Sequence, residues 1–372
     1  MTLSAVVVDD SIIFRKAVRD SLEAVGGVRV VGVAGNGLVA VEKIRQLKPD
    51  LVTLDVEMPD MDGLQVLKQL QKDQLSTKII MISSLTQRGA SATTEALSLG
   101  AFDFILKPNG GDAKRNLSEL QQQLSVRVRE ISRIAVRPVA LLPSRPESNL
   151  FKAVKPAKSS AVFQPNLGKR ELPEVVLIGI STGGPQALRG MLTQLPADFP
   201  VPVIVVQHMP PMFTASMARD IDKAAPLNVV EAADAMPIRT GTIYIAPGGK
   251  QLGLSGAPYD LRADVNDDPA QRNCKPSVDY LFKSAIRVLG GNVLGLIMTG
   301  MGDDGLDGCR GLQAAGAAIW AQDEASCTVY GMPRQIVENG LADEVIPLGK
   351  IASKLANASY RRPVVQTLAS RS

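Results

Sequence analysis

Short runs of aliphatic and β-branched residues alternate with amphipathic stretches over the first 123 residues. Between residues 13 and 25 the apolar side chains recur about every 3.6 positions, the period of a helix with one buried face. Five β-branched runs frame such stretches and predict strands: SAVVVDD, VRVVGVAG, DLVTLDV, KIIMISS and AFDFILKP. Strands that alternate with helices predict an α/β domain built on a doubly wound parallel sheet.

The same alternation returns from residue 173 to about residue 358. Six runs predict strands here: VVLIGIS, VPVIVVQ, GTIYIAP, VLGLIMTG, AAIWAQ and DEVIPL. Glycine-rich turns follow several of them, which is typical of connections from a strand to a helix. We therefore expect a second doubly wound parallel-sheet domain over residues 173–358, followed by a loose tail over residues 359–372.

Residues 124–172 lack this alternation, because helical periodicity fades after Ile134 and six prolines follow between residues 138 and 173. Between residues 127 and 171 the chain has ten Lys or Arg residues and three Glu residues. Charged, proline-rich segments rarely bury enough apolar surface to fold. We interpret 124–172 as a solvated, extended linker; an electrostatic docking arm is the alternative.

The composition is that of a soluble globular protein, with 45% hydrophobic and 21% charged residues. No apolar run approaches about 18 residues and no signal peptide is evident, so we expect a cytoplasmic protein without a membrane span. The three cysteines lack a CxxC spacing, and the chain has one histidine, which argues against disulfides and zinc. The net charge of +4 does not indicate nucleic-acid binding.

Five polar residues stand where predicted strands of the first domain end. Asp9 and Asp10 follow the first strand, Asp55 the third, Ser83 the fourth and Lys107 the fifth. Ligands of parallel sheets bind outside these carboxyl ends. Clustered carboxylates favour Mg²⁺, which neutralises charge on a phosphoryl group. The pattern predicts a phosphoryl acceptor at Asp55 with Lys107 and Ser83 on the phosphoryl oxygens; the alternative for the Asp pair is simple helix capping.

Three predicted strands of the second domain end in the parts of a nucleophilic site. Ser181 ends VVLIGIS, the single histidine, His208, follows VPVIVVQ, and Asp303 and Asp304 follow VLGLIMTG. A serine hydroxyl needs a base to take its proton and a third group to orient that base. A histidine that merely satisfies a loop is the alternative. The matching positions at strand ends favour the catalytic interpretation.

The turn after Ser181 favours an oxyanion site. Two glycines allow a sharp turn, and Pro185 suits the first turn of a helix, whose N–H groups would face a developing oxyanion. GISTG fits G-x-S-x-G, but the order Ser, His, Asp differs from that of α/β-hydrolases. A phosphate-binding turn is the alternative, although GxxxxGK[ST] and the full GxGxxG pattern are both missing.

Residues 1–123 resemble the receiver domains of two-component response regulators. The matching motifs are DD at 9–10, LDVEMPDMDG around Asp55, SS at 83–84 and KP at 107–108. The resemblance implies a flavodoxin-like fold and phosphorylation of Asp55 by a histidine kinase. It also implies Mg²⁺ held by Asp10, Asp55, the Glu57 carbonyl and Asp9, with Phe104 at the position of an aromatic switch residue.

The second domain completes a wider resemblance. IGISTGGP, QHMP, IYIAPGGKQL, CKPSVDYLF and TGMGDDG occur in order behind the receiver. Together they resemble the chemotaxis response regulator protein-glutamate methylesterases, the CheB family. This implies a Rossmann-like catalytic domain that hydrolyses glutamyl methyl esters on chemoreceptors and deamidates receptor glutamines. It assigns Ser181 as nucleophile, His208 as base and acid, and Asp304 as orienting carboxylate, with Thr182 and the Met301 N–H in the oxyanion region.

Two positions depart from the family pattern. Gln251 stands where many relatives have a histidine, so that position is not catalytic here. Asp303 stands where the motif commonly has Asn. A second carboxylate beside Asp304 either raises a pKa or points to solvent and leaves the triad unaffected.

The sequence thus predicts a phosphorylation-controlled esterase whose receiver covers the catalytic cleft. Its predicted partners are methylated chemoreceptors and a chemotaxis histidine kinase, without nucleic acid. The esterase domain is expected to need no cofactor, and the chain to be a monomer. A non-enzymatic adaptor and a DNA-binding response regulator are the alternatives. Loss of Ser181 or His208 would favour the first; the second lacks a helix-turn-helix signature.

Overall fold

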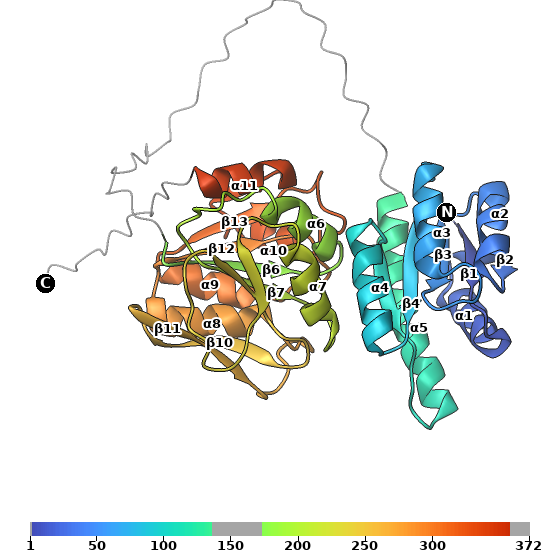
Figure 1. Cartoon of the computed structure of the whole chain (residues 1–372), viewed down its shortest axis with the longest axis horizontal. Coiled ribbons are helices and arrows are strands. Elements are labelled where there is room, and N and C mark those ends of the chain that lie inside the picture. The colour runs from blue at the N-terminus through green and yellow to red at the C-terminus, as the bar shows by residue number, and fades with distance from the viewer. Residues whose placement is uncertain (1, 136–172, 358–372) are drawn as a thin grey trace, which may run out of the picture.

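The structure is a computed structural model that describes residues 2–135 and 173–357 (Figure 1). The described chain forms two α/β units, in agreement with the prediction. Most of the predicted linker, residues 136–172, and the predicted tail lie outside the described residues. No helix within residues 2–135 and 173–357 is long and apolar enough to cross a membrane.

The first unit is a five-stranded parallel sheet in the order β2-β1-β3-β4-β5. All five predicted strands form: β1 Leu3–Val8, β2 Val28–Ala34, β3 Leu51–Asp55, β4 Lys78–Ser83 and β5 Asp103–Leu106. The helices are α1 Ile12–Val25, α2 Gly37–Leu47, α3 Gly63–Lys72, α4 Gln87–Ser98 and α5 Ala113–Ala135. The central strand β3 is buried throughout, which agrees with its mostly apolar sequence, LVTLD.

The predicted boundary at residue 123 was wrong, because it falls inside α5. This helix buries one stripe of apolar residues against the sheet. The stripe consists of Leu120, Leu124, Val128 and Ile131. Spacings of four, four and three keep these residues on one face, while Arg129 and Arg133, two of the basic residues that suggested a linker, are exposed. Residues 124–135 therefore belong to the receiver unit.

The second unit is a seven-stranded parallel sheet in the order β14-β13-β12-β6-β7-β9-β8. Its strands are β6 Val175–Ile180, β7 Val203–Gln207, β8 Asn228–Glu231, β9 Thr242–Ile245, β12 Val293–Ile297, β13 Ala318–Gln322 and β14 Glu344–Ile346. Its helices are α6 Gly184–Leu192, α7 Phe213–Asp222, α8 Val278–Leu289, α9 Leu306–Ala314, α10 Met332–Glu338 and α11 Leu348–Ala356. Six of these strands were predicted, and the short edge strand β8 was not.

An antiparallel hairpin was also missed by the sequence interpretation. Strands β10 (Gln251–Ala257) and β11 (Asp260–Asn266) pair with each other and pack on α8. Gly, Ser, Asp, Arg and Asn interrupt their apolar pattern, so β-propensity gave little signal. The hairpin supports the loop of residues 267–276, which runs beside His208.

The two units pack against each other through α4 on one side and α6 and α7 on the other (Figure 1). At the centre of the contact, the rings of Phe104 and Phe213 stack with centroids 4.9 Å apart and planes 16° apart. Both rings are buried, and they belong to one apolar cluster with side chains of both sheets. The interface is therefore a continuous core, with the predicted switch residue in it.

Candidate active site and acidic pocket

Ser181 lies at the carboxyl end of β6, between the neighbouring strands β7 and β12. Its turn into α6 needs glycine, because Gly183 has φ 79° and a Cβ there would lie 2.3 Å from Oγ1 of Thr328. The backbone N–H of Ser181 donates to the Thr299 carbonyl, and Gly184 donates to the Ser181 carbonyl. The turn therefore fixes Ser181 above the start of α6.

His208 follows β7 directly and forms a close pair with the predicted acid. Its Nε2 lies 2.8 Å from Oδ2 of Asp304. Burial lowers the pKa of His208, but the hydrogen bonds to Asp304 and Cys274 outweigh it and raise that pKa to about 9. Ser181 and His208 line the same pocket, of about 480 Å³. The structure thus brings all three predicted groups to one edge of the sheet.

Asp304 is buried at the N-terminus of α8. It accepts hydrogen bonds from the Ser277 hydroxyl and from the N–H groups of Val278 and Asp279, at 2.9, 2.7 and 3.1 Å. Burial raises the pKa of Asp304, but the bonds from His208 and the helix backbone outweigh it and lower that pKa below its ordinary value. This carboxylate therefore stays charged and can hold the imidazole in one orientation.

Asp303 turns away from the imidazole. Its Oδ2 lies 2.5 Å from Nη1 of Arg272, and 46% of its side chain is exposed. The same guanidinium pairs with Asp279 and Asp307. Of the two outcomes expected for this family departure, the structure has the outward-facing one, with Asp303 ion-paired to Arg272.

The two predicted oxyanion residues have different surroundings. Thr182 is buried beside Ser181, and its hydroxyl donates to Oδ2 of Asp103 on β5, at 3.2 Å. Met301 lines a separate pocket of about 620 Å³. Its neighbour Gly300 lies against Ser181, since a Cβ there would be 2.8 Å from Cβ of Ser181.

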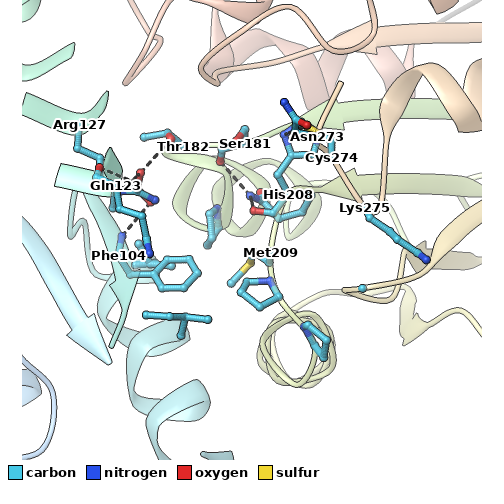
Figure 2. Close-up of a pocket in the computed structure, with 18 of the residues that line it drawn as sticks. Phe104, Gln123, Arg127, Ser181, Thr182, His208, Met209, Asn273, Cys274 and Lys275 are labelled. Atoms are coloured by element: carbon cyan, nitrogen blue, oxygen red, sulfur yellow. Dashed lines mark hydrogen bonds and ion pairs between the residues drawn. The ribbon is translucent and has the colours of Figure 1, made fainter. Parts of the chain in front are cut away.

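One wall of the serine pocket comes from the receiver unit (Figure 2). Asp103, Phe104 and Arg127 line it together with Ser181 and His208. Arg127 on α5 pairs with Asp103 at 3.1 Å, so one carboxylate joins α5, β5 and the serine turn. Motif matching missed this link because a contact between units leaves no local sequence pattern.

Other functional neighbours were also missed. Cys274 lies beside His208, with Sγ 4.0 Å from Nδ1, and the Gln207 side chain donates to the Ser181 carbonyl at 3.0 Å. The available signal was CKPSVDYLF, which by itself indicates only a family match. Gln251 is buried and accepts from the Ser277 N–H, so it supports the N-cap that holds Asp304.

The acidic pocket forms as predicted at the carboxyl edge of the first sheet. Asp9, Asp10 and Asp55 have carboxylate oxygens within 4.8 Å of one another. Nζ of Lys107 lies 3.0 Å from Asp9 and 2.7 Å from Asp55. Burial and the charge of Asp9 outweigh Lys107 and raise the pKa of Asp55 to about 6.

A divalent cation suits this donor set, because it would relieve the repulsion among three clustered carboxylates. Ser83 is buried at the end of β4, with its hydroxyl bonded to the Ser84 carbonyl. Glu57 donates its N–H to Asp55 and accepts from the Ser84 hydroxyl. Its carbonyl as a metal ligand stays a prediction.

The protein-glutamate methylesterase/protein-glutamine glutaminase of Desulfotalea psychrophila is 43% identical over 365 residues, which cover 95% of this chain and 98% of that relative. The CheB methylesterase family model matches residues 176–355. This chain belongs to the CheB methylesterase family. The response regulator receiver domain model matches residues 5–118.

A second relative agrees with this family, and one solved structure was also matched. A protein of the same name from Lawsonia intracellularis is 40% identical, over 96% of this chain and 99% of its own. The solved CheB methylesterase catalytic domain of Thermotoga maritima is 38% identical and covers 50% of this chain and 97% of its own, with a TM-score of 0.48.

Proposed function

We propose that this chain hydrolyses glutamyl methyl esters of chemoreceptors at Ser181, under the control of phosphorylation at Asp55. The observation that carries the proposal is the pair of His208 and the buried, charged Asp304 in reach of the serine pocket. The relatives described above are named for methylesterase and glutaminase activity.

His208 acts through Nδ1, because Asp304 holds Nε2. Nδ1 takes the hydroxyl proton as Oγ of Ser181 attacks the ester carbonyl, and the tetrahedral oxyanion faces the N–H groups at the start of α6. His208 then gives the proton to the leaving methoxide, which departs as methanol. Water attacks the acyl-serine with the same base, and the products are a glutamate carboxylate and free Ser181.

Thr182 and the Met301 N–H complete the proposed oxyanion region. In the described state the Thr182 hydroxyl donates to Asp103 and is therefore turned toward the receiver. Release of that bond frees the hydroxyl for the tetrahedral oxygen. Receptor glutamine side chains suit the same chemistry with ammonia as the leaving group, which is the proposed deamidase activity.

Control begins at the acidic pocket. Asp9, Asp10 and Asp55, with the Glu57 carbonyl, would hold Mg²⁺, which supplies charge neutralisation for an incoming phosphoryl group. Asp55 is the acceptor for a phosphoryl group from a chemotaxis histidine kinase. Lys107 then pairs with the phosphoryl charge, and the Ser83 hydroxyl donates to one of its oxygens.

The receiver restrains the esterase by forming a wall of the serine pocket. A phosphoryl group at the end of β3 would bind Ser83 and Lys107, which lie at the ends of the neighbouring strands β4 and β5. Strand β5 also has Asp103 and Phe104, which contact the esterase unit. A shift in β5 therefore loosens both the polar and the apolar contact with the catalytic unit.

Methanol release from a methylated chemoreceptor, with and without a small phosphodonor and Mg²⁺, tests the proposal. The full chain should respond to the phosphodonor, Asp55→Asn should not, and Ser181→Ala should release no methanol in either condition. Ammonia release from the glutamine form of the same receptor tests deamidation. Normal hydrolysis by folded Ser181→Ala would refute the serine mechanism.

A further inference from the structure

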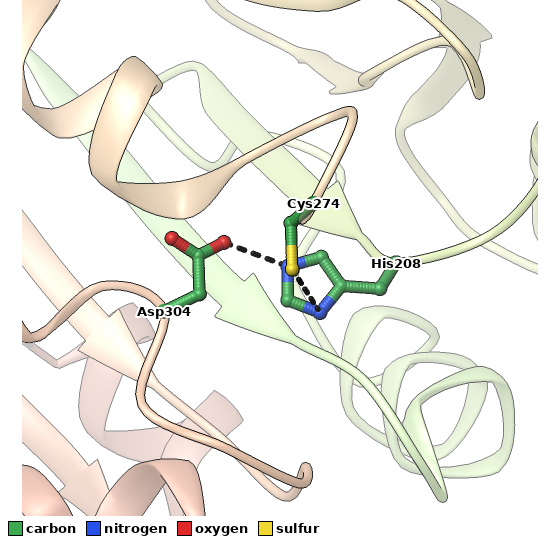
Figure 3. A group of neighbouring side chains, drawn as sticks. All are labelled: His208, Cys274 and Asp304. Atoms are coloured by element: carbon green, nitrogen blue, oxygen red, sulfur yellow. Dashed lines mark hydrogen bonds and ion pairs between the residues drawn. The ribbon is translucent and has the colours of Figure 1, made fainter. Parts of the chain in front are cut away.

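A thiol, an imidazole and a carboxylate form a close group, with their ligand atoms within 4.8 Å of one another (Figure 3). Sγ of Cys274 is 4.0 Å from Nδ1 of His208, and Nε2 on the other edge of the ring is 2.8 Å from Asp304. Figure 2 shows Cys274 and His208 together at the serine pocket, which they both line. Cys274 thus faces the ring nitrogen that the proposed mechanism assigns to Ser181.

The same three residue types also suit zinc, but the hydrogen bonds that Asp304 already accepts argue against a three-ligand metal site. The Asp304 oxygens already accept from Ser277, Val278 and Asp279 besides His208. The arrangement is instead that of a nucleophilic Cys-His-Asp array.

Charge and access both favour a reactive sulfur at this position. The pKa of His208 is raised to about 9, so its imidazole is positively charged at pH 7, with Nδ1 4.0 Å from Sγ of Cys274. Cys274 is partly exposed in a pocket of about 480 Å³. Cys309 gives the contrast, because it is fully buried and burial raises the pKa of its thiol.

We propose that Cys274 is an oxidisable modification site whose sulfenic acid form blocks ester hydrolysis. The Cys274 thiolate attacks one oxygen of hydrogen peroxide; the S–O bond forms as the O–O bond breaks, and the sulfur is oxidised by two electrons. The departing hydroxide takes the Nδ1 proton of His208 and leaves as water. The blocking effect rests on the proposed catalytic roles of Ser181 and His208.

The block follows from position. The new sulfenic oxygen extends from Sγ toward Nδ1 and can donate its proton there, in competition with the Ser181 hydroxyl. A low-molecular-weight thiol reverses the change: it displaces the oxygen as water to form a mixed disulfide, and a second thiol releases Cys274.

Labelling kinetics of the full chain test the array independently of ester hydrolysis. With iodoacetamide at pH 7, Cys274 should react about tenfold faster than in His208→Gln, because that variant lacks the imidazolium. The label on each cysteine is followed by mass spectrometry of peptides, with Cys327 as the internal control whose rate should not depend on His208. Equal Cys274 rates in the two folded proteins would overturn the array.

The second measurement concerns the block. Methanol release by the phosphodonor-activated chain should fall at least tenfold after peroxide, in step with trapping of Cys274 by dimedone, and recover with dithiothreitol. Each variant is compared with its own untreated rate. Cys327→Ser should keep the loss, and Cys274→Ser should show none. Persistent loss in Cys274→Ser would overturn the proposal.

Failure of the proposed function gives a different result. In that case the untreated, activated full chain releases no methanol, while the labelling rates of Cys274 remain measurable. Fast, His208-dependent labelling together with undiminished methanol release after complete sulfenic acid formation would refute the block alone.

Discussion

The acidic pocket and the serine site occupy equivalent places, at the carboxyl edges of two parallel sheets, and each has a buried carboxylate at its centre. Their electrostatics are opposite. Burial and Asp9 raise the pKa of Asp55 to about 6, whereas the bonds from His208 and from the N–H groups of Val278 and Asp279 lower the pKa of Asp304 despite its burial. The negative charge of Asp55 is only partly compensated, which suits a carboxylate that must react with a phosphoryl group.

The other carboxylate is fully satisfied, which suits a group that must only orient its neighbour. A parallel sheet edge supplies the location in both units, but the number of donors at each carboxylate decides its chemistry. The contrast shows that the role of an aspartate at a strand end depends on the hydrogen-bond donors around its carboxylate.

The largest expected effect comes from removing the nucleophile that the satisfied carboxylate serves. Ser181→Ala should lower the rate of methanol release by about 10⁶-fold. Combining it with His208→Ala should lower that rate little further, because the two groups act as one unit. Rates of the single and double variants, with folding checked by circular dichroism, measure this. Additive losses would show that the two residues act separately.

The next effect tests whether Asp304 must stay charged. Asp304→Asn should lower methanol release by about 10⁴-fold, since an amide holds the wrong imidazole tautomer. Asp303→Asn is the matched control, because that side chain faces Arg272 and solvent; it should change the rate by less than about tenfold. The reverse ranking would assign the orienting role to Asp303.

The acid affects the pH profile through the base. Because the pKa of His208 is about 9 in the folded protein, the neutral base is scarce at pH 7 and forms as the pH rises. The activated chain should therefore hydrolyse ester roughly 50-fold faster at pH 9 than at pH 7, after subtraction of the Ser181→Ala rate. A profile that is flat above pH 7 would contradict this environment for His208.

Asp55 should show the opposite of a satisfied carboxylate. Its pKa is raised from 3.8 in the unfolded chain to about 6 in the folded chain, so the folded chain binds more protons between these pH values. The free energy of unfolding therefore falls as the pH rises from about 4 to about 6. Without Mg²⁺, Asp55→Asn should raise the free energy of unfolding of the receiver unit by about 3 kcal/mol at pH 7 and little below pH 4. Urea titrations at both pH values measure this difference, and an equal gain at both would contradict it.

The smallest effect concerns the link between the two sites. Asp103→Ala removes the acceptor of Thr182 and the partner of Arg127, and should raise esterase activity without phosphodonor by about tenfold, or about 1.4 kcal/mol. Asp73→Ala, which removes a surface pair with Arg45, is the matched control and should leave the rate unchanged. Equal rates for the two variants would remove Asp103 from the restraint.

Sequence periodicity located every strand end that bears a candidate group. Because the strands are parallel, their carboxyl ends lie along the same edge of the sheet. The alternation of strands and helices was therefore enough to place Asp55, Lys107, Ser181 and His208. It was not enough for the hairpin of residues 251–266, since polar residues break the pattern there. The end of α5 was missed because its buried stripe is narrow and its outer face is highly charged.

The remaining failures concern long-range contacts. The choice between Asp303 and Asp304 depends on Arg272 and on the start of α8, which are distant in sequence from both. The bond from Thr182 to Asp103 joins two units and has no local signature. In the sequence, Cys274 is only part of a family motif; its contact with His208 is seen in the structure.

The order of these groups along the chain has a consequence for biosynthesis. The receiver occupies the first 135 residues, while Asp304 and the strands β13 and β14 come last. A ribosome delivers domains from the N-terminus, and each generally folds as a unit. The regulator is therefore complete before the orienting acid has left the ribosome, so a newborn molecule has its restraint in place before it has a working triad.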